Sequence, residues 1–329
     1  MSEASALFQD VAERLFADAC PLEVTAAAEA GEFPQDLWGA LEDAGFLSML
    51  LPESDGGAEA SLADAGAILR AAGRHAAPGP ILETILGRRL LADAGLAAPA
   101  GPLPIAFLGD GAPGPARARW GRAADLCLIV EQTSAGAALR FAEVACEGSD
   151  ASFEPMDVIT TAGATVAVAA GPAYEQALAS AALLKSAQML GAMDWCVERC
   201  LAFAGEREQF GKAIGGFQAI QHHLVVLAEE SVAAAAIVGA ALSAADDERL
   251  SLTAVARSRL GDAVDTARWF AHQTHGAIGF TREYPLNYRT RRLIAWRDDF
   301  GSTVFWRDRL AAQLIGAPAQ DLWARMVQA

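Results

Sequence analysis

Two short polar segments of this sequence contain residues that could bind a phosphorylated ligand. The first runs from Arg207 to His222 and combines a cation, glutamine amides and paired glycines. A guanidinium can hold phosphate, while amides and an aromatic face suit a nucleobase or a ribose. The second runs from Gln273 to Glu283, and its glycines let the backbone approach a ligand closely. A solvated turn between helices is the competing interpretation of both segments.

Other kinds of reactive centre find little support in the sequence. No GxSxG nucleophile elbow is present, and no glycine-rich stretch has the GK[ST] ending of a P-loop. His222 and His223 are adjacent, so on a helix they point about 100° apart. His272 and His275 lack a nearby cysteine or carboxylate that would complete a ligand set. We therefore expect no metal site.

Composition narrows the class of protein. The chain has 329 residues, a formal charge of −16 and 53% hydrophobic residues, so it can bury a sizeable core. The acidic balance argues against a nucleic-acid partner, which needs clustered cations. The longest apolar stretch, residues 231–245, is shorter than the roughly 20 residues of a membrane span. Five scattered cysteines and an N-terminus without an apolar signal region predict a reduced, cytoplasmic location.

The two polar segments lie among elements that divide the chain into three regions. We expect an N-terminal helical domain over residues 1–100, a reduced β domain over 101–171 and a C-terminal helical bundle over 172–329. Apolar periodicity and turn residues predict helices at 62–73, 79–92, 174–205, 217–245 and 252–275, another after Pro285, and strands at 126–130, 139–144 and 165–169. The fold class is therefore mainly α. Antiparallel helices need not bring the two polar segments to one end, and a second subunit could be required to assemble them.

Both segments resemble motifs of the acyl-CoA dehydrogenase family. The pattern RxQFGKxIxxFQAxQH starts at Arg207, and QxHGxxGFTxEYPL starts at Gln273. The similarity covers the N-terminal helical region and the C-terminal bundle well, and the middle region poorly. It implies the family fold: an N-terminal helical domain, a central β domain and a C-terminal four-helix bundle. It also implies oxidation of acyl-CoA thioesters to 2,3-enoyl-CoA, with a glutamate removing the α-proton and FAD accepting hydride.

The resemblance assigns cofactor-binding residues to positions in this chain. In the family these motifs contact the ADP part of an FAD held mainly by the neighbouring subunit, so FAD would be shared across a subunit interface. Arg207 would pair with the pyrophosphate, and the backbone at Gly276 and Ala277 would lie near it, with alanine replacing a usual glycine. The residues implicated are Arg207, Gln209, Phe217, Gln218, Gln273, Gly276 and Ala277.

Departures from the family pattern concern the reaction centre. No TEPxAGSD-like segment, which holds the flavin ring, occurs between Pro102 and Gly171. Phe300 occupies the place of the catalytic glutamate, and the alternative base position falls near Ala181. Neither side chain can accept a proton. Asp299 is one residue away from the family position and is the remaining candidate base, but a solvated acidic pair with Asp298, near Arg291, Arg292 and Arg297, is the favoured interpretation.

Three hypotheses follow from the matches and the departures. The first is a shortened, base-free subunit that completes the FAD site of a larger partner, as in heteromeric enzymes acting on CoA thioesters of steroid side chains. The second is a self-sufficient homomeric dehydrogenase that uses Asp299 or another base. The third is a non-enzymatic helical scaffold or binding protein. The first two imply an acyl-CoA substrate and an electron-transfer acceptor.

Overall fold

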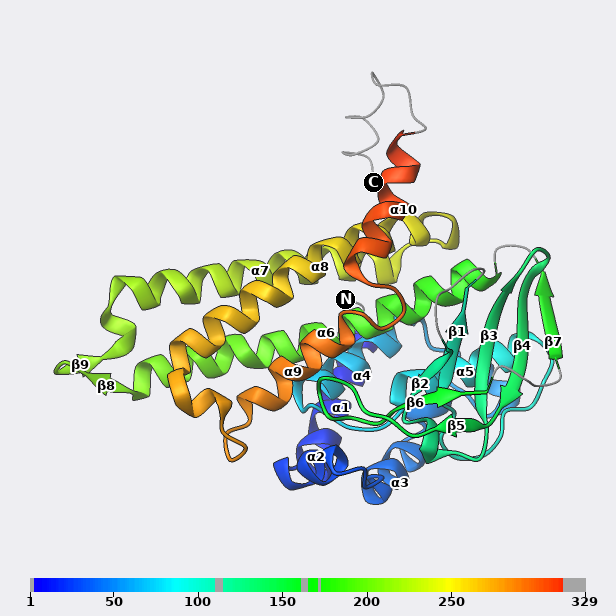
Figure 1. Cartoon of the computed structure of the whole chain (residues 1–329), viewed down its shortest axis with the longest axis horizontal. Coiled ribbons are helices and arrows are strands. Elements are labelled where there is room, and N and C mark those ends of the chain that lie inside the picture. The colour runs from blue at the N-terminus through cyan, green and yellow to red at the C-terminus, as the bar shows by residue number, and fades with distance from the viewer. Residues whose placement is uncertain (1–2, 110–114, 161–164, 171–172, 316–329) are drawn as a thin grey trace.

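A computed structural model describes residues 3–109, 115–160, 165–170 and 173–315. Helices dominate both ends of the chain, and two small sheets lie between them (Figure 1). This arrangement confirms the predicted mainly α architecture with a reduced central β region. The glycine-rich stretch 109–115, whose composition favours a turn, lies mostly outside the described residues.

The N-terminal region consists of short helices whose ends follow local signals. They are α1 (Glu3–Ala19), α2 (Leu22–Glu29), α3 (Gln35–Asp43), α4 (Leu62–Arg74) and α5 (Ile81–Asp93). Pro34 immediately precedes α3, a position that suits proline because its missing N–H is not needed at a helix start. A capping box starts α4: the Ser61 hydroxyl accepts from the Asp64 N–H (3.2 Å), and the Asp64 carboxylate accepts from the Ser61 N–H (2.9 Å). Helices α4 and α5 match the predicted segments within two residues at each end.

The β region forms two sheets around a small apolar core. The first sheet has the order β1 (Ile105–Leu108), β3 (Cys127–Thr133), β4 (Gly136–Ala142) and β7 (Thr165–Ala170). The second has the order β2 (Arg117–Arg119), β6 (Met156–Ile159) and β5 (Val144–Cys146). The predicted strand at 139–144 is wrong in its bounds, because β4 begins earlier and ends before β5. Strands of three or four residues, such as β1 and β2, are too short to show a two-residue period.

Five helices complete the described chain: α6 (Ala173–Glu206), α7 (Gln218–Ser243), α8 (Asp246–His275), α9 (Leu286–Trp296) and α10 (Thr303–Ile315). Helix α8 begins six residues earlier than predicted. Its first turn holds Asp246, Asp247 and Glu248, whose charges favour a helix N-terminus although they interrupt the apolar pattern. Only two residues separate α7 from α8, so these helices run antiparallel.

Helix α6 links the two main cores of the molecule. Its first half, including Leu178, packs with Ile68 of α4, Leu82 of α5 and Val130 of β3. Its second half, including Met193, packs inside the bundle with α7, α8 and α9. The N-terminal helices, the first sheet and the bundle are therefore joined through one 34-residue helix.

Helix α7 is unusually exposed for an apolar helix. It is 26 residues long, its most apolar window has a mean hydropathy of 1.8, and 33% of that window is buried. By length and composition alone it could cross a membrane, since the helix extends well beyond the apolar stretch 231–245. A single helix of this kind is weak evidence for a membrane span, because the core helix of a soluble protein passes the same test. That no segment spans a membrane stays a prediction.

Candidate functional site

The first polar segment forms a rigid hairpin at the corner between α6 and α7. Strands β8 (Glu208–Gln209) and β9 (Lys212–Ala213) are joined by Phe210 and Gly211, whose φ angles are +54° and +79°. Two consecutive positive φ values are typical of a type I′ turn, which matches the twist of a hairpin. The turn holds Phe210 at its tip, where the side chain is 93% exposed. We call residues 207–222 the hairpin corner.

Side chains of the hairpin corner are presented outward. Arg207 and Gln218 are exposed, and within the described chain the Arg207 guanidinium makes no ion pair. The Gln209 amide donates to the Glu208 carbonyl (2.6 Å) and is also exposed. Phe217 is half-buried under the Lys212 ammonium, which lies 4.3 Å from the ring centroid. The corner thus offers a cation, amides and aromatic rings to a ligand or a partner.

The second polar segment forms the end of α8 and the following 3₁₀ turn, Gly276–Phe280. Gly276 has φ +64° and ψ −144°, a conformation that suits glycine, and a Cβ there would meet no atom within 4 Å. Gln273 and Ala277 are exposed beside it. Burial lowers the pKa of His272 to about 4, so this ring stays neutral where it stacks on Phe280 (4.1 Å). We call residues 273–283 the α8-end corner.

Both corners lie at one end of the bundle within a single chain. Helices α6 and α8 each run antiparallel to α7, so they point the same way and end together, at the left in Figure 1. Phe203 near the end of α6 stacks on His275 at 4.4 Å, and Arg199 donates to the Tyr284 hydroxyl at 2.6 Å. A second subunit is therefore not needed to bring the corners to the same end.

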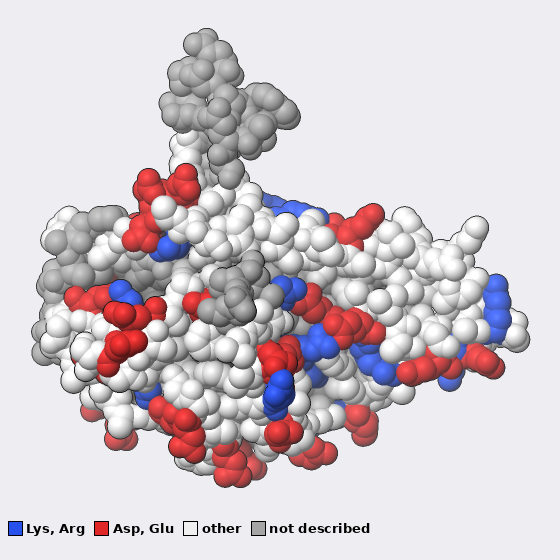
Figure 2. All heavy atoms as spheres, turned by 180° about the vertical axis from the view of Figure 1, so that it is seen from behind, with Lys and Arg blue, Asp and Glu red and all other residues white. Residues whose placement is uncertain are grey.

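The surface around these corners suits association with an anionic cofactor and a partner. Figure 2 shows the bundle end, on the right, as largely uncharged surface with basic atoms at its tip and acidic atoms along its lower edge. Leu201, Phe210, Ile278 and Phe280 are exposed apolar side chains near this end. Outward-facing donors at Arg207 and Gln273, together with the open backbone at Gly276, fit the adenylate and diphosphate portion of a dinucleotide.

A separate cavity of about 580 Å³ surrounds Phe300, between α5, α6, β1, β2 and the α9–α10 loop. Phe300 has φ +56°, which is rare for an aromatic residue, and its ring packs edge-on against Phe107 at 5.5 Å. Buried Arg257 of α8 holds this loop: its Nη2 donates to the carbonyls of Arg297 (2.6 Å), Asp299 (2.8 Å) and Gly301 (3.0 Å). The loop conformation is thus fixed from outside the cavity.

Asp299 is tied into a buried ion cluster. Arg119 Nε and Nη2 donate to its two carboxylate oxygens at 3.1 and 3.0 Å, and Lys185 Nζ lies 3.4 Å from one of them. Burial alone would raise the pKa of Asp299, but the nearby positive charges of Arg119 and Lys185 outweigh it, and the pKa is lowered. A carboxylate held in its charged form this way is a weak general base.

The sequence analysis missed Arg119, Glu83 and Lys185 of this cluster. Lys185 Nζ lies 3.4 Å from Glu83 Oε1, and both side chains are at most 2% exposed. Each residue is a single charge inside an apolar helical run, ILETIL for Glu83 and AALLKSAQML for Lys185. A single charge in an apolar helical run could have indicated a buried ion pair, because a buried charge requires a partner. Ala181 and Ala182 are fully buried on α6 and provide no acid–base group.

Comparison with known families matches both helical regions. Residues 172–315 match the sequence model for the acyl-CoA dehydrogenase C-terminal domain, and residues 2–96 match that for the N-terminal domain. Acyl-CoA dehydrogenase IpdE2 of Mycolicibacterium smegmatis is 28% identical over 327 residues, which cover 98% of this chain and 97% of the relative. Acyl-CoA dehydrogenase FadE34 of Mycobacterium tuberculosis is 28% identical over 313 residues, and the match spans 42% of that longer protein.

Solved structures with the same fold include two complexes. A chain of the ChsE4–ChsE5 complex from Mycobacterium tuberculosis superposes with a TM-score of 0.82 at 19% identity, covering 97% of this chain and 99% of the other. A chain of the Tcur3481–Tcur3483 steroid ACAD gives a TM-score of 0.79 at 23% identity, covering 99% of each chain. At these identities the likeness establishes the fold.

Proposed function

Because the chain belongs to the acyl-CoA dehydrogenase family, we propose that it is the shortened, non-catalytic subunit of a heteromeric FAD-dependent enzyme. In this proposal a larger partner subunit holds the flavin ring and supplies the base. The observation that carries the proposal is the lack of a free carboxylate at Phe300. By the sequence resemblance, Phe300 occupies the family's base position, and the carboxylate of the adjacent Asp299 pairs with Arg119 and Lys185.

The remaining carboxylates of that cavity are poor substitutes for a base. Glu83 is paired with Lys185, and Asp150 lies 2.7 Å from Arg119 Nη1. A general base must reach the substrate proton with a free carboxylate oxygen, whereas each of these carboxylates already pairs with a cation. Asp298 faces the cavity mouth but is largely exposed to solvent. We therefore assign α-proton removal from the acyl-CoA to the partner.

This chain's contribution would be to the cofactor's adenylate end. Bound FAD supplies the hydride acceptor for α,β-dehydrogenation. Arg207 would pair with its diphosphate, Gln209 and Gln218 would hydrogen-bond the adenosine portion, and Phe217 would provide an aromatic face. At the α8-end corner, Gln273 and the backbone of Gly276 and Ala277 would complete the contacts. A cofactor held between two subunits binds only when both are present.

The nature of the partner is also a proposal. Two of the structural neighbours are complexes, one of them a steroid ACAD, and the IpdE2 relative matches nearly end to end. We propose the same kind of assembly here, with an acyl-CoA thioester, including a steroid-type side chain, as substrate and an electron-transfer acceptor as oxidant. We also keep a cytoplasmic location and the domain boundaries near residues 100 and 171 as proposals.

Co-expression with a longer family member tests the proposal. The partner would be a chain that carries the flavin-ring motif and the glutamate missing here. We expect the isolated chain to be colourless, and the co-purified complex to contain flavin at less than one FAD per chain.

Arg207→Ala should lower flavin retention in the complex. Arg14→Ala, which changes an exposed arginine on α1 far along the chain from the hairpin corner, is the control and should not. A yellow, active preparation of this chain alone would overturn the proposal in favour of a self-sufficient enzyme. A complex that binds neither FAD nor acyl-CoA would favour a scaffold.

A further inference from the structure

A second large cavity lies on the other side of the molecule's central helix, between α1, α4, α6 and α7. Its volume is about 670 Å³, within the range of small-molecule sites. None of its lining residues also lines the cavity around Phe300. The C-terminal half of α7 forms one wall of this cavity, and its side chains do not fill it. The cavity therefore contributes to the low burial of α7. We call it the inter-helix cavity.

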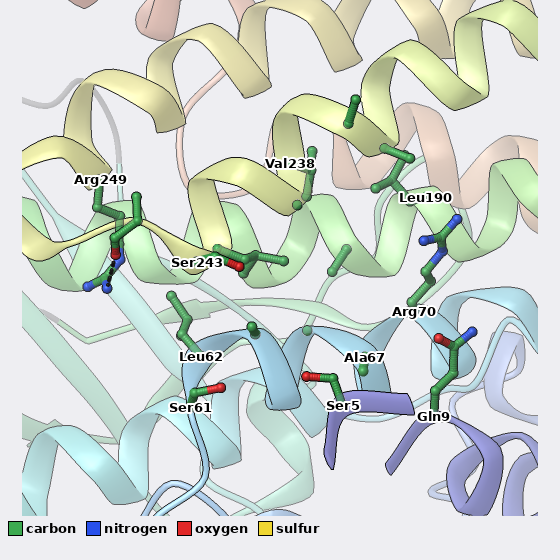
Figure 3. Close-up of a pocket in the computed structure, with 18 residues that line it drawn as sticks. Ser5, Gln9, Ser61, Leu62, Ala67, Arg70, Leu190, Val238, Ser243 and Arg249 are labelled. Carbon is green, nitrogen blue, oxygen red and sulfur yellow. Dashed lines mark hydrogen bonds between the residues drawn. The ribbon is translucent and has the colours of Figure 1, made fainter. Parts of the chain in front are cut away.

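Many residues that line the inter-helix cavity are small. Alanines and glycines of α4, α6 and α7 line it together with Leu62, Leu190 and Val238, and serines and Gln9 add polar groups (Figure 3). Gly239 lines the cavity, and a Cβ built on it would meet no atom within 4 Å. The small side chains therefore leave room that a larger residue at this position could occupy.

The charged residues that line the cavity are both arginines, although the whole chain carries a net charge of −16. Arg70 and Arg249 lie on opposite sides of it (Figure 3). Arg70 Nε is bound to Asp194 (2.7 Å), which approaches from outside the lining. A molecule with an apolar body and one anionic group would thus find a cation at either end of the cavity.

Arg249 is the better anchor of the two. Its Nη1 binds Asp246 and its Nη2 donates to the Ala244 carbonyl at 2.9 Å, but its Nε is buried and, among the described residues, has no hydrogen-bond partner. A buried donor without a partner costs free energy, so a side-chain movement that brought Nε into contact with a ligand oxygen would be favoured. Arg249, Ser61 and Leu62 also line a neighbouring cavity of about 550 Å³, so a longer ligand could pass beside the guanidinium.

From these contacts we infer that the inter-helix cavity binds an amphiphilic monocarboxylate, such as a long-chain fatty acid, with its carboxylate at Arg249 and its apolar body along α7. This site is separate from the reaction centre and does not depend on the proposed function. The leucines, Val238 and the alanines of the lining would contact the apolar body, and the arginines explain the preference for an anion over a neutral lipid.

Fluorescence titration of the full chain with cis-parinaric acid tests this inference, with the methyl ester of the same acid as the neutral probe. We expect saturable binding of the acid at one site. Gly239→Leu should weaken it by at least about tenfold by filling the cavity. This variant should still fold, because leucine favours a helix more than glycine does. Ala240→Leu, one residue along and exposed outside the cavity, is the matched control and should bind normally.

Arg249→Gln tests the anchor. It should weaken the acid by about tenfold or more and leave the ester's affinity unchanged. Failure of the full chain to bind the acid, or equal binding by the wild type and Gly239→Leu, would overturn the assignment of the ligand to this cavity. Equal loss of both probes in Arg249→Gln would overturn the role of Arg249 as the carboxylate anchor.

Discussion

At the scale of single residues, Asp299 shows how a candidate catalytic carboxylate can have a structural role. Asp299 would be the obvious replacement for a glutamate one residue away. The structure instead surrounds it with Arg119, Lys185 and the Arg257-held loop. Each cation that keeps Asp299 charged also makes it a weaker proton acceptor. The same contacts tie β2, α6 and α8 to the α9–α10 loop, and the Glu83–Lys185 pair adds α5, so the cluster links elements from all three regions.

Removing the charge of Asp299 should therefore affect stability more than any activity. Asp299→Asn leaves Arg119 and Lys185 buried with fewer counter-charges, and we expect a loss of about 3–5 kcal/mol in the free energy of unfolding at neutral pH. Denaturant unfolding measures it. Asp298→Asn, whose side chain is 64% exposed, is the neighbouring control and should change stability by less than about 0.5 kcal/mol.

The pH dependence of this difference has a definite sign. The pKa of Asp299 is lowered from 3.8 in the folded state, so its stabilising contribution is complete above that value and is lost as pH falls through the lowered pKa. The gap between wild type and Asp299→Asn should narrow in acid. A variant as stable as wild type at neutral pH, but without turnover in the complex, would instead identify Asp299 as the base.

At the scale of elements, the sequence predicted the helices well and the sheets poorly. Long helices such as α6 repeat their apolar pattern over many turns, whereas β5 has only three residues in which to show one. The hairpin corner was found from residue types, but the type I′ turn was not, because Phe210 is an unusual residue at positive φ. The ion cluster was missed because its members are far apart in sequence, as Glu83 and Lys185 show.

Helices α4 and α6 cross so closely that their glycines decide the packing. A Cβ on Gly73 would overlap the Gln188 carbonyl, and one on Gly191 would overlap the Arg70 carbonyl. Alanine normally stabilises a helix interior by about 1 kcal/mol relative to glycine. We expect Gly73→Ala and Gly191→Ala to do the reverse and destabilise the chain by about 1–3 kcal/mol, because backbone must shift.

Gly239→Ala is the internal control for this prediction. Its Cβ meets open space, so the ordinary helix preference should hold and the midpoint of thermal unfolding should rise. Thermal unfolding of the three variants followed by circular dichroism makes the comparison. Stabilisation by all three alanines would show that α4 and α6 do not approach as closely as the structure indicates.

At the scale of the whole molecule, one end of the bundle exposes apolar side chains that no other part of the described chain covers. Phe210 is 93% exposed at the tip of a strained turn, which costs the isolated chain stability without burying any ring surface. Such a residue suits a partner that covers it. In the proposed heteromer the hairpin corner would then serve both the FAD adenylate and the contact between subunits.

Phe210→Asn separates these effects, because it should change folding and assembly in opposite directions. Asn-Gly is the preferred pair for a type I′ turn, so the isolated chain should be equally or more stable. Loss of a central aromatic anchor should weaken association with the partner by about 2 kcal/mol, measured by analytical ultracentrifugation of the mixed chains. Phe153→Asn is the matched control, since Phe153 is also an exposed phenylalanine at positive φ (+67°) but lies in the β region. If Phe210→Asn assembled and retained flavin as the wild type does, the partner surface would have to lie away from the hairpin corner.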